Sequence, residues 1–233
     1  IMTIFYCPTL SEACVLSEEE SLHAAKVLRL KAGDAIQIVD GKGGFYNARI
    51  TAPHHKHCGF EITGQLIDES NRDYKLHIAI APTKNIDRLE WFIEKATEIG
   101  IDEITALFCH NSERKIIKEE RLEKIIVSAS KQSLKSKFPV LNPSCSFTDF
   151  LKSAKAEQQF IAHCYNEDKR LLQNCITKGT SVIILIGPEG DFSKEEVEAA
   201  IKNGYQPVSL GNSRLRTETA GVVACCTLAI ANQ

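Results

Sequence analysis

The sequence predicts a two-part α/β protein, in which a small β-rich domain precedes a larger domain of alternating strands and helices. Residues 1–67 contain short strands and turns around one helix, and the polar stretch 68–74 that follows has no periodic apolar residues. After that stretch, apolar strands alternate with amphipathic helices, which is typical of a mostly parallel sheet with helices on both faces. We therefore expect one domain at residues 1–70 and a second at residues 71–233.

The first domain has the pattern of a small barrel. Strands are expected at residues 4–7, 35–39, 45–50 and 59–67. Glycines at positions 41, 43 and 44 supply a hairpin turn between the second and third of these strands. Residues 18–30 carry leucine and alanine at intervals of three and four, which predicts one helix.

The second domain alternates strands and helices along its length. Strands are expected at 75–81, 103–109, 159–165, 181–186 and 207–210, and helices at 87–100, 118–133, 146–154, 193–204 and 220–231. Ser193 and Glu196 form a capping box at the start of the fourth helix. The last helix is apolar all round, so it should be buried on every side, either by the rest of the fold or by a second subunit.

Composition excludes several classes of protein. The formal net charge is -2 and the pI about 6.4, so nucleic-acid binding would need a local basic face. Residues 114–137 supply one candidate, with eight basic and three acidic side chains, although such runs are often solvated helix surface. The sequence has no apolar run of the roughly 18 residues that a membrane helix requires, so we expect no membrane partner.

The cysteines and histidines do not predict a metal site. The nine cysteines include no Cys-x-x-Cys pair, and several lie in apolar runs, which favours reduced, buried thiols and a cytoplasmic location. His54, His55 and His57 lie between two predicted strands without a cysteine or carboxylate at ligand spacing. We expect an exposed loop there and no metal.

Two loops at strand ends carry the residues most suited to chemistry. In the first, a buried strand runs into Gly187-Pro-Glu-Gly190 and then a capped helix, and ligands of open α/β sheets bind in such loops. The motif is neither a dinucleotide fingerprint nor a Walker A loop, and an ordinary strand-to-helix turn remains equally possible. The second loop, 209–220, concentrates two arginines, a glutamate and several hydroxyls. Thr217 or Thr219 could simply cap the last helix, and the arginines could be solvated.

Taken together, these segments resemble the RsmE family. Gly187–Gly190, followed by Leu210-Gly211 and Arg214–Ala220, is similar to the family's two characteristic loops. The resemblance extends to His23–Asp34, Glu94–Gly100 and Ser128–Ser133, in the same order and over nearly the whole chain. Members of this family methylate N3 of a uridine in small-subunit (16S) ribosomal RNA and belong to the SPOUT superfamily.

The resemblance implies a PUA-like N-terminal barrel, a catalytic domain with a deep trefoil knot, and a homodimer formed around the knot. It implies that S-adenosylmethionine is held bent in the knot loops, largely by backbone groups. The cofactor-binding residues would be Leu185, Gly187, Glu189, Gly190, Leu210, Gly211, Leu215 and Arg216. Two departures from the family pattern are Lys131 with Leu134 in the central helix, and Asp191, where relatives often have glycine.

The same resemblance suggests roles for individual residues. Arg216 would stabilise the developing uridine anion or orient the base, Glu218 is a candidate base or a group that orients the arginine, and Glu189 would lie near the cofactor. Candidate RNA contacts are Arg29, Lys31, Arg49, Gln132 and Ser133. The partner would be 16S ribosomal RNA within the small subunit. The leading alternative is an RNA-binding or ribosome-assembly module on a catalytically inactive knot. A nucleotide-phosphate enzyme is disfavoured because no phosphate-loop motif is present.

Overall fold

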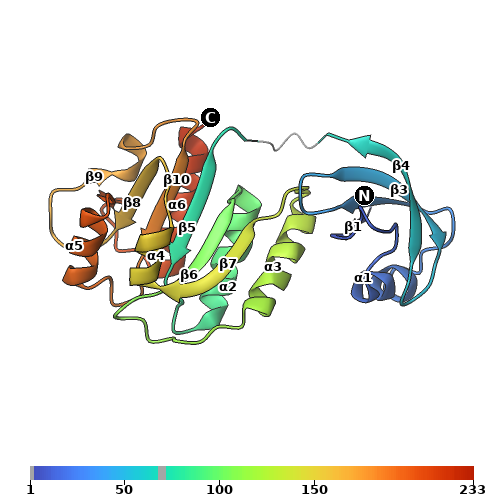
Figure 1. Ribbon diagram of the computed structural model, residues 1–233, viewed down its shortest axis with the longest axis horizontal. Helices are drawn as coiled ribbons and strands as arrows, with labels where there is room; N and C mark the ends of the chain where they lie inside the picture. Colours follow the sequence, from blue (N-terminus) through green and yellow to red (C-terminus); the bar gives the residue numbers. More distant parts are fainter. Residues whose placement is uncertain (1–2, 68–71) are drawn as a thin grey trace. The chain divides into compact units, whose positions relative to one another are not determined.

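The computed structural model describes residues 3–67 and 72–233, which form two compact units (Figure 1). The first unit combines the described residues before Asn71 with a later segment, Val127–Phe138, and the second comprises Arg72–Ile126 and Pro139–Gln233. Most of the expected linker, residues 68–71, lies outside the described residues. The domain boundary at residue 70 therefore stays a prediction. The sequence pattern did not indicate that residues 127–138 would join the first unit.

The first unit is built on a four-stranded sheet in the order β1-β2-β3-β4. Its strands are β1 (Ile4–Tyr6), β2 (Ala35–Val39), β3 (Phe45–Ala52) and β4 (Gly59–Leu66). β1 pairs parallel with β2, and the other pairs are antiparallel. Alternate apolar side chains such as Phe5, Ile36 and Ile38 face one core and are fully buried. All four expected strands are confirmed, with ends shifted by at most two residues.

The single helix expected over residues 18–30 is wrong in its form. Helix α1 (Glu18–Leu22) is capped by Ser17 and changes directly into a π-helix, His23–Val27. The Leu28 amide donates to the His23 carbonyl at 2.9 Å, five residues back, and Arg29 then takes a positive φ of 54°. Apolar residues at intervals of three and four are compatible with either helix type, so periodicity could not indicate the wider turn. Such turns occur frequently at functional sites.

Residues 127–138 are attached to the first unit by a largely buried ion pair. They include the end of α3 (Glu119–Gln132), where Lys131 Nζ lies 2.5 Å from Glu20 Oε1 and 5.7 Å from the centre of the Phe5 ring. Beyond the helix, the ring of Phe138 packs on Tyr6 with centroids 4.8 Å apart. Lys131, which departs from the family pattern, thus has a structural partner in this chain.

The second unit contains a seven-stranded sheet in the order β7-β6-β5-β10-β8-β11-β9, with every neighbouring pair parallel (Figure 1). Its strands are β5 (Lys75–Ile80), β6 (Glu103–Phe108), β7 (Val140–Ser146), β8 (Gln158–Ala162), β9 (Arg170–Leu171), β10 (Ser181–Ile186) and β11 (Gln206–Ser209). The expected parallel α/β sheet is confirmed. Strands β7 and β9 were not expected, because β7 is a polar edge strand that contains Pro143 and β9 has only two residues.

Helices cover both faces of this sheet. Helices α4 (Phe147–Ser153) and α5 (Lys194–Lys202) pack on one face through Phe150, Leu151 and Val197. Helices α2 (Ile86–Ile99) and α6 (Thr217–Ala231) pack on the other, where a Cβ on Gly221 would lie 2.6 Å from the Phe92 ring. A 3₁₀ turn, Leu172–Asn174, follows β9. The capping box predicted for α5 is confirmed.

The rest of this chain does not bury the last helix on every side, so its coverage by a second subunit stays a prediction. Helix α6 buries one face, which includes Gly221, Ala224, Cys225 and Leu228, against the sheet and α2. Its other face is partly exposed, and Ile230 is 67% exposed. Helix α6 therefore carries more apolar side chains than its packing within this chain buries.

No helix among the described residues has the length and apolar character to cross a membrane. Within the same residues, no three His, Cys, Asp or Glu side chains are grouped to hold a metal ion. His54, His55 and His57 lie in an exposed loop between β3 and β4, as expected.

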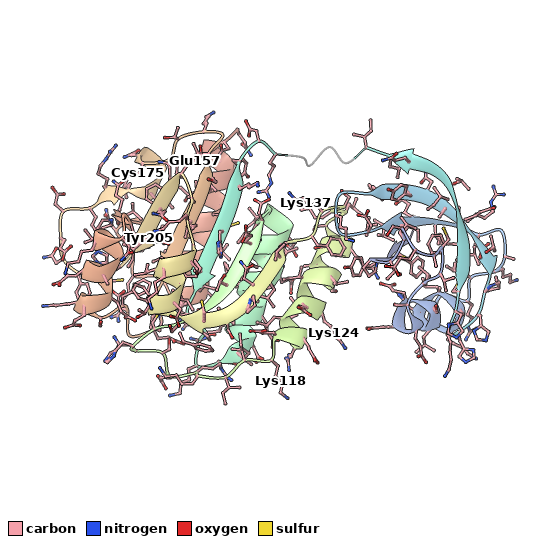
Figure 2. All side chains as sticks on the ribbon, in the orientation of Figure 1. Lys118, Lys124, Lys137, Glu157, Cys175 and Tyr205 are labelled. Carbon is pink, nitrogen blue, oxygen red and sulfur yellow. The ribbon has the colours of Figure 1, made fainter. Side chains whose placement is uncertain are left out.

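The basic segment 114–137 presents less free charge than its composition suggests. Arg114 donates to the carbonyls of Thr83 and Lys84, Lys115 donates to that of Cys109, and Arg121 pairs with Glu90. The side chains of Lys118 and Lys124 are exposed and lie on the outside of the second unit (Figure 2). A continuous phosphate-binding face over the whole segment is therefore not what the fold presents.

Candidate functional site

Three loops meet at the carboxyl edge of the large sheet. Residues 187–192 follow β10, residues 210–216 follow β11, and residues 163–165 follow β8. Because β8 lies between β10 and β11 and all three strands are parallel, their following loops must lie side by side. Ligands of open α/β sheets bind at this kind of edge.

A cavity of about 440 Å³ lies between two of these loops. It is lined along one side by the end of β8 and along the other by residues 208–215. Among its lining residues are Ala162, His163, Cys164, Leu210, Gly211 and Leu215. Of the predicted cofactor residues, the cavity thus brings together Leu210, Gly211 and Leu215. Gly187, Glu189, Gly190 and Arg216 do not line it.

The Gly-Pro-Glu-Gly loop is nonetheless tied to the same structure. The hydroxyl of Thr217, a buried residue at the start of α6, donates to the Gly187 carbonyl at 3.0 Å. The side-chain amide of Asn111 donates to the carbonyls of Gly190 and Asp191, at 3.2 and 3.0 Å. These hydrogen bonds join the loop to neighbouring segments, and the one to Gly187 matters most because its buried carbonyl would otherwise lack a donor.

Asp191 departs from the family pattern, and its backbone explains why glycine suits this position. Its φ is 62°, in the left-handed region that glycine adopts most readily and that Asp and Asn tolerate better than other residues. Its carboxylate accepts hydrogen bonds from the amides of Cys164 and Phe192, at 2.7 and 2.8 Å. Asp191 therefore joins the loop after β10 to the loop after β8.

Two predicted cofactor residues have other surroundings. Leu185 is fully buried within β10 and is paired on both sides, with Ala79 of β5 and Ile161 of β8. Its side chain packs in the core of the second unit, so it stabilises the strand that carries the loop and does not face the cavity. Glu189 is exposed, and its Oε1 accepts a hydrogen bond from the Lys84 amide at 2.9 Å. It therefore joins the Gly-Pro-Glu-Gly loop to the loop after β5.

The two candidate catalytic residues near α6 differ sharply in exposure. Arg216 is exposed and occupies the N-cap position of the helix. Glu218 is only 7% exposed, and its Oε1 lies 3.7 Å from Nε of Arg88 on α2. Its other carboxylate oxygen, Oε2, is buried and has no hydrogen-bond partner among the described residues. The cation beside Glu218 is therefore Arg88, a residue that sequence reasoning did not identify.

His163 and Cys164 are site residues that sequence reasoning missed. The His163 side chain is fully buried, and burial lowers its pKa, with a smaller contribution from Lys169 and opposing ones from Glu167 and Asp191. We therefore expect a neutral imidazole at pH 7. The predicted strand at 159–165 could have indicated these residues, since the rule that favours loops at carboxyl ends applies to β8 as well.

The five predicted RNA-contacting residues all belong to the first unit. Arg29 and Lys31 are exposed just after the π-helix, and Arg49 is exposed on β3 opposite Glu61. Gln132 is exposed at the end of α3, whereas the Ser133 hydroxyl donates to the Ala129 carbonyl at 2.7 Å. Four of the five side chains are thus available at the surface, and Ser133 caps a helix.

Comparisons with known proteins agree with this architecture. Residues 69–229 match the RNA methyltransferase domain family, and residues 16–63 match the RNA methyltransferase PUA domain. The "Ribosomal RNA small subunit methyltransferase E" of Buchnera aphidicola is 29% identical over 226 residues, which cover 94% of this chain and 88% of that protein.

Solved structures are similar over the full length. A probable rRNA-methyltransferase from Porphyromonas gingivalis superposes with a TM-score of 0.91 at 42% identity, over 99% of this chain and 98% of that one. A protein of Legionella pneumophila, solved in complex with S-adenosylmethionine, gives a TM-score of 0.89 at 28% identity over 99% and 98%. The resemblance drawn from the sequence motifs is confirmed, and the chain belongs to the RNA methyltransferase family, with a PUA domain preceding the methyltransferase domain.

Proposed function

We propose that this protein transfers a methyl group from S-adenosylmethionine to N3 of a specific uridine in 16S ribosomal RNA. The observation that carries the proposal is the cavity at the carboxyl ends of β8 and β11, whose wall is the loop with the second family motif. Family membership, relatives named for methylation of small-subunit ribosomal RNA, and the cofactor in the Legionella structure support it.

The cavity fits the cofactor in size and in chemistry. About 440 Å³ lies within the range of small-molecule sites. The Gly211 φ of 125° lets backbone approach a ligand where a side chain would stand, and Leu210 and Leu215 offer apolar walls. We propose that these three residues hold the cofactor, with Gly187 and Gly190 on the neighbouring loop. Bound there, S-adenosylmethionine supplies a methyl group on a cationic sulfonium.

The residues of this chain must then handle the proton and the charge of the uridine. N3 carries a proton in the neutral base, and its removal leaves negative charge on the ring. Arg216 is exposed beside the cavity wall and can stabilise that charge or orient the base. Glu218 is the candidate base or the group that orients an arginine. Its Oε2 has no hydrogen-bond partner among the described residues and is therefore free to accept a proton or a hydrogen bond. Glu189 holds the adjoining loop through the Lys84 amide.

The same proposal includes the arrangement around the site. The two motif loops would thread as a trefoil knot, and the partly exposed face of α6, with Val222, Val223, Cys226 and Ile230, would be covered by the second subunit of a homodimer. Arg29, Lys31, Arg49 and Gln132 would contact the RNA backbone from the PUA domain. The substrate would be ribosomal RNA within the small subunit, in the cytoplasm.

The alternative function is an RNA-binding module on an inactive knot, and cofactor binding separates the two. Calorimetric titration with S-adenosylmethionine should give one site per chain, and Gly211→Ala should weaken binding by about tenfold or more, because φ near 125° strains any other residue. Gly64→Ala is the matched control, since a Cβ there meets nothing within 4 Å. A folded wild-type protein that binds no S-adenosylmethionine would overturn the enzyme proposal.

A further inference from the structure

A second cavity lies at the opposite edge of the large sheet. Its volume is about 610 Å³, and it is formed by the first residues of β5, β6 and β10, part of β7 and the end of α4. The strands are parallel, so this amino edge is separated from the knot loops by the length of a strand, about 20 Å for six residues. It belongs entirely to the second unit and shares no residue with the cavity described above.

A connected set of polar side chains forms one wall of this cavity. The Asn142 amide donates to Glu103 Oε2 at 2.9 Å and to the Thr105 hydroxyl at 3.3 Å. The Thr105 oxygen in turn lies 2.7 Å from Nε2 of His77. Thr105 accepts from Asn142 and has one proton to donate, and in the tautomer in which that proton goes to Nε2 the imidazole proton is on Nδ1. Burial lowers the pKa of His77, which is consistent with a neutral ring.

Two groups of this network remain able to bind something else. Nδ1 of His77 lies 3.8 Å from Glu103 Oε2, too far for a hydrogen bond. The Glu103 side chain is 46% exposed, and its Oε1 accepts no hydrogen bond from the described residues. In the tautomer that carries the proton on Nδ1, the cavity presents a carboxylate acceptor directly beside an N–H donor. A few polar groups beside one another in a cavity fix a ligand's orientation in small-molecule sites.

The remaining walls suit a flat ring with an anionic substituent. Phe150, whose ring meets His77 edge-on with centroids 5.3 Å apart, and the apolar Val182 and Ile183 line the cavity beside the polar wall. Lys75 and Lys155 also line it, and both are exposed lysines with no ion pair to a described residue. A ligand would therefore place its ring against this apolar part of the wall and its negative charge near two ammonium groups.

The order of donors and acceptors selects among flat rings. A carboxylate accepts two neighbouring N–H groups, and the His77 N–H beside it requires an acceptor next to them. Guanine presents an amino group, a ring N–H and a keto oxygen in that order. Adenine and cytosine have a ring nitrogen acceptor next to the amino group, and uracil has its N3–H between two keto oxygens. Each of these bases would therefore bring an acceptor atom against the Glu103 carboxylate, which is unfavourable.

We propose that the amino-edge cavity is a nucleotide-binding site that recognises a guanine base through Glu103 and His77 and its phosphate through Lys75 and Lys155. Two forms present this chemistry, a free guanine mononucleotide and a guanine residue of a single-stranded RNA. The site is independent of the methyl-transfer loops, so it can be tested whether or not the proposed methylation is correct.

The test uses the full-length protein with ¹³C-labelled histidine and follows the His77 imidazole by NMR, assigned with the His77→Gln variant. The probes are GMP, guanosine, AMP, and two short oligouridylates that carry a single internal G or A. We expect GMP, the G-containing oligonucleotide or both to shift the His77 signals with saturation. Glu103→Gln should weaken that binding by about tenfold or more, as expected for loss of a charge-assisted pair.

Two control variants make the result specific. Glu103 begins β6, and Glu113 lies in the loop after the end of that strand. Glu113→Gln therefore removes a carboxylate far from the cavity and should leave guanine binding unchanged. Lys155→Ala should weaken GMP but not guanosine, whereas Lys152→Ala, on the outside of α4, should affect neither. A response to GMP identifies the free nucleotide as ligand, and a response to the G-containing RNA alone identifies RNA. No shift of His77 with either guanine probe, or equal binding of the adenine probes, would overturn the proposal.

Discussion

The hydrogen bond from Thr217 to Gly187 connects the second motif loop to the first, and removing it tests whether this bond holds the two loops together. Thr217→Val keeps the shape of the side chain and removes the only proton that it donates. The Gly187 carbonyl is buried, so its loss of a donor should cost about 1–3 kcal/mol. This corresponds to roughly 5- to 150-fold in the folding equilibrium constant. The loop should also become less well positioned, so S-adenosylmethionine binding should weaken.

Urea unfolding of matched variants measures this cost. Thr217→Ser retains the hydroxyl and should keep most of the cofactor affinity. Thr227→Val is the control on the same helix, where the hydroxyl donates to the Val223 carbonyl at 2.8 Å within α6 and its loss should cost about 0.5 kcal/mol or less. If Thr217→Val unfolds at the same urea concentration as Thr227→Val and binds the cofactor as the wild type does, the bond does not hold the loops together.

Two further predictions concern the packing that supports the site. Lys131→Met should destabilise the protein by about 3–5 kcal/mol, because it leaves the buried carboxylate of Glu20 unpaired, and adding Glu20→Gln should recover much of the loss. An additive double variant in thermal or urea unfolding would contradict that pairing. Gly221→Ala should destabilise despite the gain of about 1 kcal/mol in helix propensity, because the new Cβ meets an aromatic ring of α2 at 2.6 Å. Gly64→Ala, where the new Cβ meets no atom, should change the free energy of unfolding little. If Gly221→Ala instead raises the free energy of unfolding, the packing of α2 on α6 adjusts to the added Cβ and the reasoning is wrong.

The order of strands and helices could be predicted because burial imposes a period on the sequence. Strands such as β10 are buried on both faces and read as continuous apolar runs, and Ser193 with Glu196 shows where α5 begins. Strand β7 could not be predicted in this way, since its hydrogen bonds to β6 depend on tertiary placement and its sequence has no apolar alternation. The π-helix could not be predicted either, because the spacing of its apolar residues also fits an α-helix.

The candidate site was only partly visible in the sequence. Motif spacing identified Leu210, Gly211 and Leu215, which line the cavity, because the loop that carries them follows a recognisable strand. The role of Arg88 beside Glu218 could not be predicted, since the two residues lie 130 positions apart and meet only through the packing of α2 on α6. Leu185 was assigned to the cofactor from its place in the motif, although its pairing on both sides puts it in the core.

The most direct test of the proposed activity is methyl transfer itself. Small ribosomal subunits from cells that lack the gene would be incubated with labelled S-adenosylmethionine and wild-type protein, Arg216→Ala or the exposed control Lys202→Ala on α5. We expect label at N3 of a single uridine of 16S ribosomal RNA with the wild type and the control, and a loss of about 100-fold or more in rate with Arg216→Ala. Cofactor binding without transfer to any ribosomal substrate, or full transfer by Arg216→Ala, would contradict the account of the target or of the site.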